Sequence, residues 1–108
     1  MPTPTTQLSV TRYLGLPDDT IDTGLAGVVD SVNVLVAGWR PLADPDELAY
    51  PTPVQQGATM LAARVWRRRN SPAGVESYGD LGPTYVQRND PDVAMLLGLG
   101  YYTVPVVG

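Results

Sequence analysis

Apolar residues recur at helical spacing between Asp18 and Arg40. They follow the spacing i, i+4, i+7, i+8, i+11, i+14, i+15 and i+18 and form one continuous stripe: Ile21, Leu25, Val28, Val29, Val32, Leu35, Val36 and Trp39. Asp18 or Asp19 can cap the start of this helix, and Pro41 prevents its continuation. The pattern therefore predicts a long helix with one buried face.

A second long helix is expected from Thr52. Thr52 can cap it, with Pro53 at its first position and Gln55 completing a capping box. Its apolar stripe repeats at i, i+4, i+7 and i+11 over Val54, Ala58, Leu61 and Val65. The small alanines favour close packing against the first helix, so we expect the two long helices to be antiparallel.

A short helix is expected over residues 5–14, ahead of the two long ones. Thr6, or the threonine before it, can cap its start. Gly15 can adopt the left-handed conformation that ends many helices. The expected buried contacts of this helix are Leu8 and either Tyr13 or Leu14.

The region after the second long helix contains a long connection and one more short helix. Residues 71–89 contain several Gly and Pro and are expected to form a partly extended loop. The sequence Asn89-Asp90-Pro91-Asp92 is typical of a capped start and predicts a helix over 93–97, which Gly98 ends. The tail 101–108 is apolar, β-prone and uncharged, so we expect it to be extended.

Together these patterns predict one all-α domain over residues 1–108, which is the size of a single domain. We expect a small helical bundle with two long antiparallel helices and two short helices. A loose arm over residues 1–4 precedes the bundle. The helical core covers 5–100 and includes the loop 71–89, and the extended tail 101–108 follows.

Composition excludes most enzyme classes. The chain has no His and no Cys, which removes the commonest general base, the thiol nucleophile and the main ligands of transition metals. Helix capping explains the acidic residues at 18–22, and a solvated loop explains those at 44–47. We therefore expect no enzymatic activity, no cofactor and no metal site. A net charge of −4 and a pI near 4.4 also argue against a free nucleic-acid-binding protein.

All seven basic residues are Arg, and four of them cluster near the end of the second long helix: Arg64, Arg67, Arg68 and Arg69. On a helical wheel the first three lie on the side away from Val54 and Val65. A solvated helix end and salt bridges to a neighbouring subunit explain the cluster equally well. Binding of DNA phosphates by Arg64–Arg69 is the alternative, and it would indicate a small helical DNA-binding regulator.

Three segments and the closing LLGLGYY follow one another in a characteristic order. SVTRYLGLPDDTIDTGLAGVVDSVNVLV is marked by Tyr13, Leu14, Asp18, Asp19 and the stripe from Ile21. PVQQGATMLAARVWRRRNSPAGV is marked by Ala58, Leu61, Ala62, Trp66, Arg69, Ser71, Pro72 and Gly74. ESYGDLGPTYV is marked by Glu76, Gly79, Asp80 and Tyr85. In this order, over nearly the whole chain, they resemble the head–tail connector family of long-tailed bacteriophages, also described as head-to-tail adaptors or head completion proteins.

The resemblance implies a structural virion protein that catalyses no reaction. Such proteins form a ring beneath the portal, join the DNA-filled head to the tail and extend the DNA channel. The implied partners are further copies of the chain in a ring expected to be twelvefold, the portal protein, the next head-closure or tail protein, and double-stranded DNA that passes without specific binding. The implied location is the head–tail junction of the virion, assembled in the bacterial cytoplasm without membrane contact.

Two groups of residues are expected at interfaces of such a ring. Contacts between subunits are assigned to Arg64, Arg67, Arg68, Glu76, Tyr78, Asp80 and Tyr85. Contacts to the portal are assigned to Tyr101, Tyr102, Val104, Val106 and Val107. An extended uncharged strand can add to a sheet edge of a partner. Folding back of the tail over its own helices is an equally weighted alternative.

Overall fold

The computed structural model describes residues 2–44, 46–68 and 83–99, and within them the side chains of 84, 85 and 89 are excepted. Every regular element in these ranges is a helix, so the all-α prediction is confirmed. The helices are α1 (Gln7–Tyr13), α2 (Thr23–Trp39), α3 (Thr52–Arg68), α5 (Pro83–Asn89) and α6 (Pro91–Leu97).

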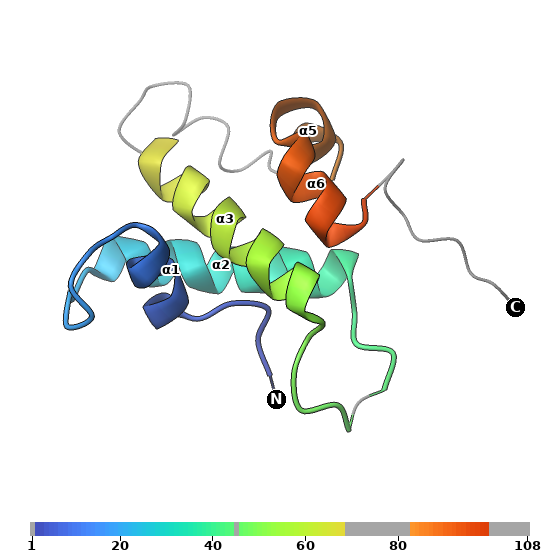
Figure 1. Cartoon of the computed structure of the whole chain (residues 1–108), viewed down its shortest axis with the longest axis horizontal. Coiled ribbons are helices and arrows are strands. Elements are labelled where there is room, and N and C mark those ends of the chain that lie inside the picture. Colours follow the sequence, from blue (N-terminus) through green and yellow to red (C-terminus); the bar gives the residue numbers. More distant parts are fainter. Residues whose placement is uncertain (1, 45, 69–82, 100–108) are drawn as a thin grey trace, which may run out of the picture.

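Helix α3 is the central element of the bundle (Figure 1). It lies across α2 and runs in the opposite overall direction, as expected for the two long helices. Helices α1 and α6 also pack against α3, and α5 packs on α6. A single 17-residue helix therefore contributes to contacts with three other helices.

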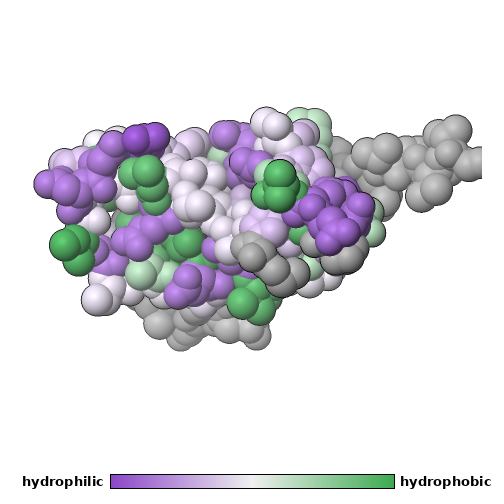
Figure 2. Space-filling view, turned by 90° about the horizontal axis from the view of Figure 1, so that it is seen from below, coloured by the Kyte–Doolittle hydropathy of each residue, from purple (hydrophilic) through white to green (hydrophobic). Residues whose placement is uncertain are grey.

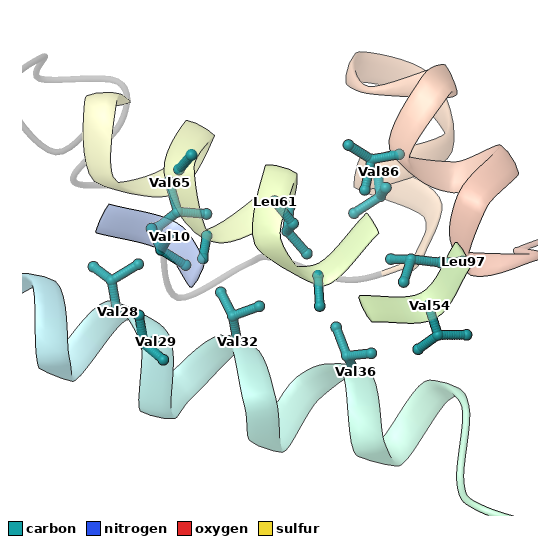
Figure 3. Close-up of a cluster of buried hydrophobic side chains, with 14 of the residues drawn as sticks. Val10, Val28, Val29, Val32, Val36, Val54, Leu61, Val65, Val86 and Leu97 are labelled. Carbon is teal, nitrogen blue, oxygen red and sulfur yellow. The ribbon is translucent and has the colours of Figure 1, made fainter. Parts of the chain in front are cut away.

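The core forms where the stripe of α2 faces α3, as Figure 3 shows. Val28, Val32 and Val36 point from α2 toward Leu61 and its neighbours on α3. Helix α3 is buried on an unusually wide face, because its small residues allow several helices to approach it. Its buried residues are Val54, Gly57, Ala58, Thr59, Leu61, Ala62, Ala63 and Val65.

The start of α2 differs from the sequence expectation. The helix begins at Thr23, and the carboxylate of Asp22 caps it by accepting hydrogen bonds from the backbone N–H groups of Gly24 and Leu25 at 2.9 and 3.2 Å. The expected caps at 18 and 19 are therefore wrong. Ile21, the first residue of the expected stripe, precedes the helix and is 93% exposed.

The short helix α1 is placed correctly and Leu14 at its end packs against the core as expected, but Leu8 does not. Thr6 caps it by accepting a hydrogen bond from the Ser9 N–H, and Gly15 has the left-handed φ of 75°. Val10 is fully buried, whereas Leu8 is exposed. Leu8 was thus wrongly expected in the core, because the helix makes only about two turns and buries the face that carries Val10 and Thr11.

Helix α5 lies inside the region expected as loop. Pro83 opens it, in a position where the missing N–H costs nothing, and Val86 is fully buried. The β-prone sequence around Val86 was interpreted as extended, and tertiary burial of Val86 overrides that local preference. The remainder of the expected loop, 71–82, and the tail 101–108 lie outside the described residues.

A polar network ties the N-terminal arm to the two long helices. The side-chain amide of Asn33 accepts a hydrogen bond from the Thr5 N–H at 2.8 Å and donates one to the Thr5 carbonyl at 3.0 Å. The Thr5 and Thr59 hydroxyls are 2.7 Å apart and share a hydrogen bond. Pro4, next to this network, is buried. The arm is therefore attached to α2 and α3 up to Pro4.

The tightest helix contact lies between α3 and α6, at Gly57. A Cβ atom at this position would lie 2.9 Å from Cγ and Cδ2 of Leu97 and 3.1 Å from Cβ of Leu96. Leu97 is fully buried. The absence of a side chain at Gly57 is therefore what allows α6 to approach α3 so closely.

We predict that Gly57→Ala destabilises the protein despite the better helix propensity of Ala. Overpacking against Leu97 costs about 1–3 kcal/mol, which exceeds the gain of up to about 1 kcal/mol in propensity. Urea unfolding followed by circular dichroism measures the change.

Gly27→Ala is the matched control, because Gly27 is an exposed glycine within α2 and a Cβ there would meet nothing within 4 Å. It should raise the unfolding free energy by up to about 1 kcal/mol. Equal stabilisation by both substitutions would contradict the close packing at Gly57.

Candidate functional site

The arginine cluster of α3 meets two carboxylates at the start of α6. Arg64 forms a two-pronged contact with Asp92: Nη1 donates to Oδ1 at 2.7 Å and Nη2 donates to Oδ2 at 2.5 Å. Nη1 also donates to Oδ1 of Asp90 at 3.0 Å. Parallel N–H···O bonds of this kind fix the guanidinium geometry as well as supplying charge attraction.

Asp90 is the buried member of this cluster. Its side chain is only 3% exposed, and its Oδ1 also accepts a hydrogen bond from Nη2 of Arg68 at 2.6 Å. Oδ2 is buried and accepts no hydrogen bond within the described part of the chain. Two guanidinium groups thus compensate one buried carboxylate, which would otherwise be costly to remove from water.

Arg64, Arg68, Asp90 and Asp92 together form what we call the α3–α6 clamp. Residues 64 and 68 are one helical turn apart and share a face of α3. Asp90 and Asp92 flank Pro91 at the start of α6. Since Asp92 meets Arg64 while Leu97 lies against Gly57, α6 runs antiparallel to α3. The clamp therefore fixes one end of α6 and the Gly57 contact fixes the other.

The ion pair between Arg64 and Asp92 shifts the pKa of both residues. Hydrogen bonding to Arg64 is the main cause that lowers the pKa of Asp92 from its usual 3.8 to about 2. Hydrogen bonding to Asp92 is likewise the main cause that raises the pKa of Arg64. Both groups therefore stay charged throughout the neutral range.

The clamp was missed by the sequence analysis, which assigned Asp90 and Asp92 to helix capping. Asp90 does occupy the N-cap position of α6, but its side chain makes no capping hydrogen bond. The carboxylate turns to Arg64 and Arg68 instead. Two arginines at i and i+4 on a helix, and two carboxylates flanking a proline, are the signals in the sequence that were available for this pairing.

The expected interface residues fall into three groups. Arg64 and Arg68 make ion pairs within the chain, so a neighbouring subunit is not needed to neutralise them. Arg67 is exposed and makes no ion pair with a described residue. The others lie outside the described side chains: Glu76, Tyr78, Asp80, Tyr85, Tyr101, Tyr102, Val104, Val106 and Val107.

The described residues bear on three further kinds of feature: metal clusters, membrane-spanning helices and surface grooves. No three Asp, Glu, His or Cys side chains in this part of the chain gather as metal ligands would. Among the described helices, none combines the length and hydropathy needed to cross a bilayer. An open groove of about 480 Å³ lies between the N-terminal arm, α1 and α3, and most of the residues that line it are Thr, Ser or Gln. Arg12 is the one charged residue that lines this groove.

Comparison of the chain with protein-family models, with curated proteins and with solved structures gives no match.

The depressed pKa of Asp92 predicts a stability change in acid. A carboxylate whose pKa is lower in the folded state adds stability above its unfolded pKa and loses it as pH falls through the folded pKa. The contribution of Asp92 should therefore disappear between about pH 4 and about pH 2. Because this side chain is 49% exposed, solvent screening keeps the contribution below about 1 kcal/mol.

Urea unfolding of the wild type and of Asp92→Asn, measured from pH 5 to pH 2, isolates this effect from the other acidic groups. The two unfolding free energies should converge at the acid end. Parallel curves over the whole range would show that the pairing with Arg64 adds no stability.

We predict a larger effect for Asp90→Ala. Its removal leaves Arg64 and Arg68 facing a partly buried site without their shared carboxylate, and such a loss costs about 3 kcal/mol. The matched control is Asp18→Ala, which removes a carboxylate paired with Arg12 at 3.0 Å on the exposed surface. Thermal unfolding should show a much smaller change for the control, and similar changes in both variants would contradict the role of burial.

Proposed function

We propose that this chain is a head–tail connector of a long-tailed bacteriophage. In this role it forms a ring beneath the portal, joins the DNA-filled head to the tail and continues the DNA channel. The observation that carries the proposal is the order of the resembling segments over nearly the whole chain. That order now coincides with an all-helical chain in which a short helix precedes two long antiparallel helices.

The positions of the resembling residues in the fold support the proposal. Leu61 and Ala62 lie in the buried face of α3, and Leu14 and Trp66 pack against the same core. Part of the resemblance therefore falls on residues that pack in the helical core. Conversely, the absence of His and Cys from the sequence fits a role in assembly, since it removes the commonest catalytic side chains.

The overall charge also suits a DNA channel. A wall with many free cations would hold phosphates and slow the passage of DNA. The chain has a net charge of −4, and two arginines of its basic cluster are engaged by carboxylates. DNA can therefore pass a ring of such subunits without being retained.

The same ion pairs argue against a DNA-binding regulator. Phosphate binding by Arg64 or Arg68 would have to compete with Asp90 and Asp92, one of which is buried beside them. Only Arg67 among the described members of the cluster is exposed and without an ion pair to a described residue. Arg69 lies outside the described residues, and one exposed cation by itself gives weak, salt-sensitive affinity.

The experiment that separates the two functions measures binding to both partners. Purified chain is mixed with the portal protein of the same phage and, in parallel, with double-stranded DNA at physiological salt. The connector role expects co-sedimentation with the portal and no retention of DNA. Retention of DNA without portal binding would favour the regulator.

The tail supplies a more specific prediction for this role. We expect deletion of residues 101–108 to leave a folded, soluble chain that no longer co-sediments with the portal, because the tail provides the docking strand. Far-UV circular dichroism checks the fold of the deletion variant. A variant that unfolds would instead support the tail as a cover for its own helices, and a variant that still binds the portal would exclude the tail as the docking element.

A further inference from the structure

An open groove of about 500 Å³ lies between α1 and the turn that leads into α2. It is lined by Gln7, Leu8, Thr11, Asp18, Asp19, Thr20 and Ile21. We call it the acidic groove, because its only charged lining residues are two carboxylates. The turn that forms it is held closed at one side by the ion pair between Arg12 and Asp18.

The acidic groove exposes two large apolar side chains. Leu8 is 43% exposed and Ile21 is 93% exposed, although both occupy positions at which the sequence pattern places buried residues. At the left of Figure 2, where α1 and this turn lie, apolar residues stand directly beside hydrophilic ones. Because Leu8 and Ile21 line the same groove, they form one exposed apolar surface that a partner could cover.

The charges around the acidic groove are unbalanced. Three carboxylates, of Asp18, Asp19 and Asp22, stand against the single guanidinium of Arg12. Asp19 makes no ion pair with any residue that the structure describes. A partner that fits this groove should therefore bring both apolar surface and positive charge.

At the end of α3 and on α5, positive side chains outnumber negative ones among the described residues. Around the C-terminal end of α3 and on α5, the guanidinium groups of Arg64, Arg67, Arg68 and Arg88 stand against the carboxylates of the α3–α6 clamp. Arg67 and Arg88 are exposed, and neither forms an ion pair with a described residue. In Figure 1 the C-terminal end of α3 and helix α5 lie in the upper part of the molecule, whereas α1 and the turn that leads into α2 lie at the left.

We infer that the acidic groove of one copy binds the basic surface of a second copy, at the end of α3 around Arg67. The two surfaces differ, so the contact is head-to-tail and its repetition generates a closed ring or an open filament. That the repeated contact closes into a ring rests on the proposed connector function. The pairing of the two surfaces rests on their charges and on the exposed apolar side chains of the groove.

The charge requirement selects the second copy over the tail of the same chain. Residues 101–108 contain no charged side chain, so they offer nothing to the carboxylates of Asp18 and Asp19. The end of α3 offers the exposed guanidinium of Arg67, whereas the neighbouring Trp66 packs against the core of its own chain. The occupant that matches the charge of the groove is therefore present on the chain itself.

The test measures self-association of the full chain by sedimentation over a range of concentrations up to the millimolar range. Asp19→Arg alone and Arg67→Glu alone should each weaken association by at least about tenfold, because each places like charges across the contact. An equal mixture of the two variants should restore it, since each mutated surface then meets its opposite charge.

An apolar variant and its control complete the test. Ile21→Ser should weaken association, whereas Leu48→Ser should not, because Leu48 is equally exposed at 95% but lies outside the acidic groove. A wild-type chain that stays monomeric at every concentration, or a mixture that fails to restore association, overturns the inference.

The portal distinguishes failure of this interface from failure of the proposed function. If Asp19→Arg still assembles on the portal as the wild type does, this interface is wrong and the connector function stands. If the charge-swapped mixture restores self-association but no variant binds the portal, the interface stands and the connector function is wrong.

Discussion

The close approach of α6 to α3 at Gly57 is the constraint on which the rest of the fold depends. Helix α3 must accept α1, α2 and α6 on its surface, and it does so with small residues such as Ala58 and Ala62. A short helix like α6 has little stability of its own. Contacts with α3 therefore fix its position: Leu97 packs against Gly57 at one end, and Asp90 and Asp92 form ion pairs with Arg64 at the other.

The same arrangement decides which charges remain available to a partner. The α3–α6 clamp neutralises Arg64 and Arg68 within the chain, so the basic surface that remains is smaller than the four-arginine cluster in the sequence indicates. A basic surface with few unpaired arginines suits contacts between protein subunits more than it suits phosphate binding. The acidic balance of the chain points in the same direction.

Periodicity in the sequence predicts both long helices and most of their buried residues, because an apolar stripe must face the core wherever the helix lies. It fails at Ile21, which precedes the first residue of α2, and at Leu8, which lies on the exposed face of α1. It also fails at α5, whose burial of Val86 depends on tertiary contacts. The α3–α6 clamp could not be placed, since Arg64 and Asp90 are distant in sequence and meet only after α6 docks.

We propose that this helical chain assembles as a ring on the portal. Electron micrographs of the purified chain mixed with its portal protein test this most directly. Averaged end views should show a closed ring of density coaxial with the portal and absent from images of the portal alone. Images in which the portal carries no added ring, at chain concentrations that saturate sedimentation binding, would contradict the account.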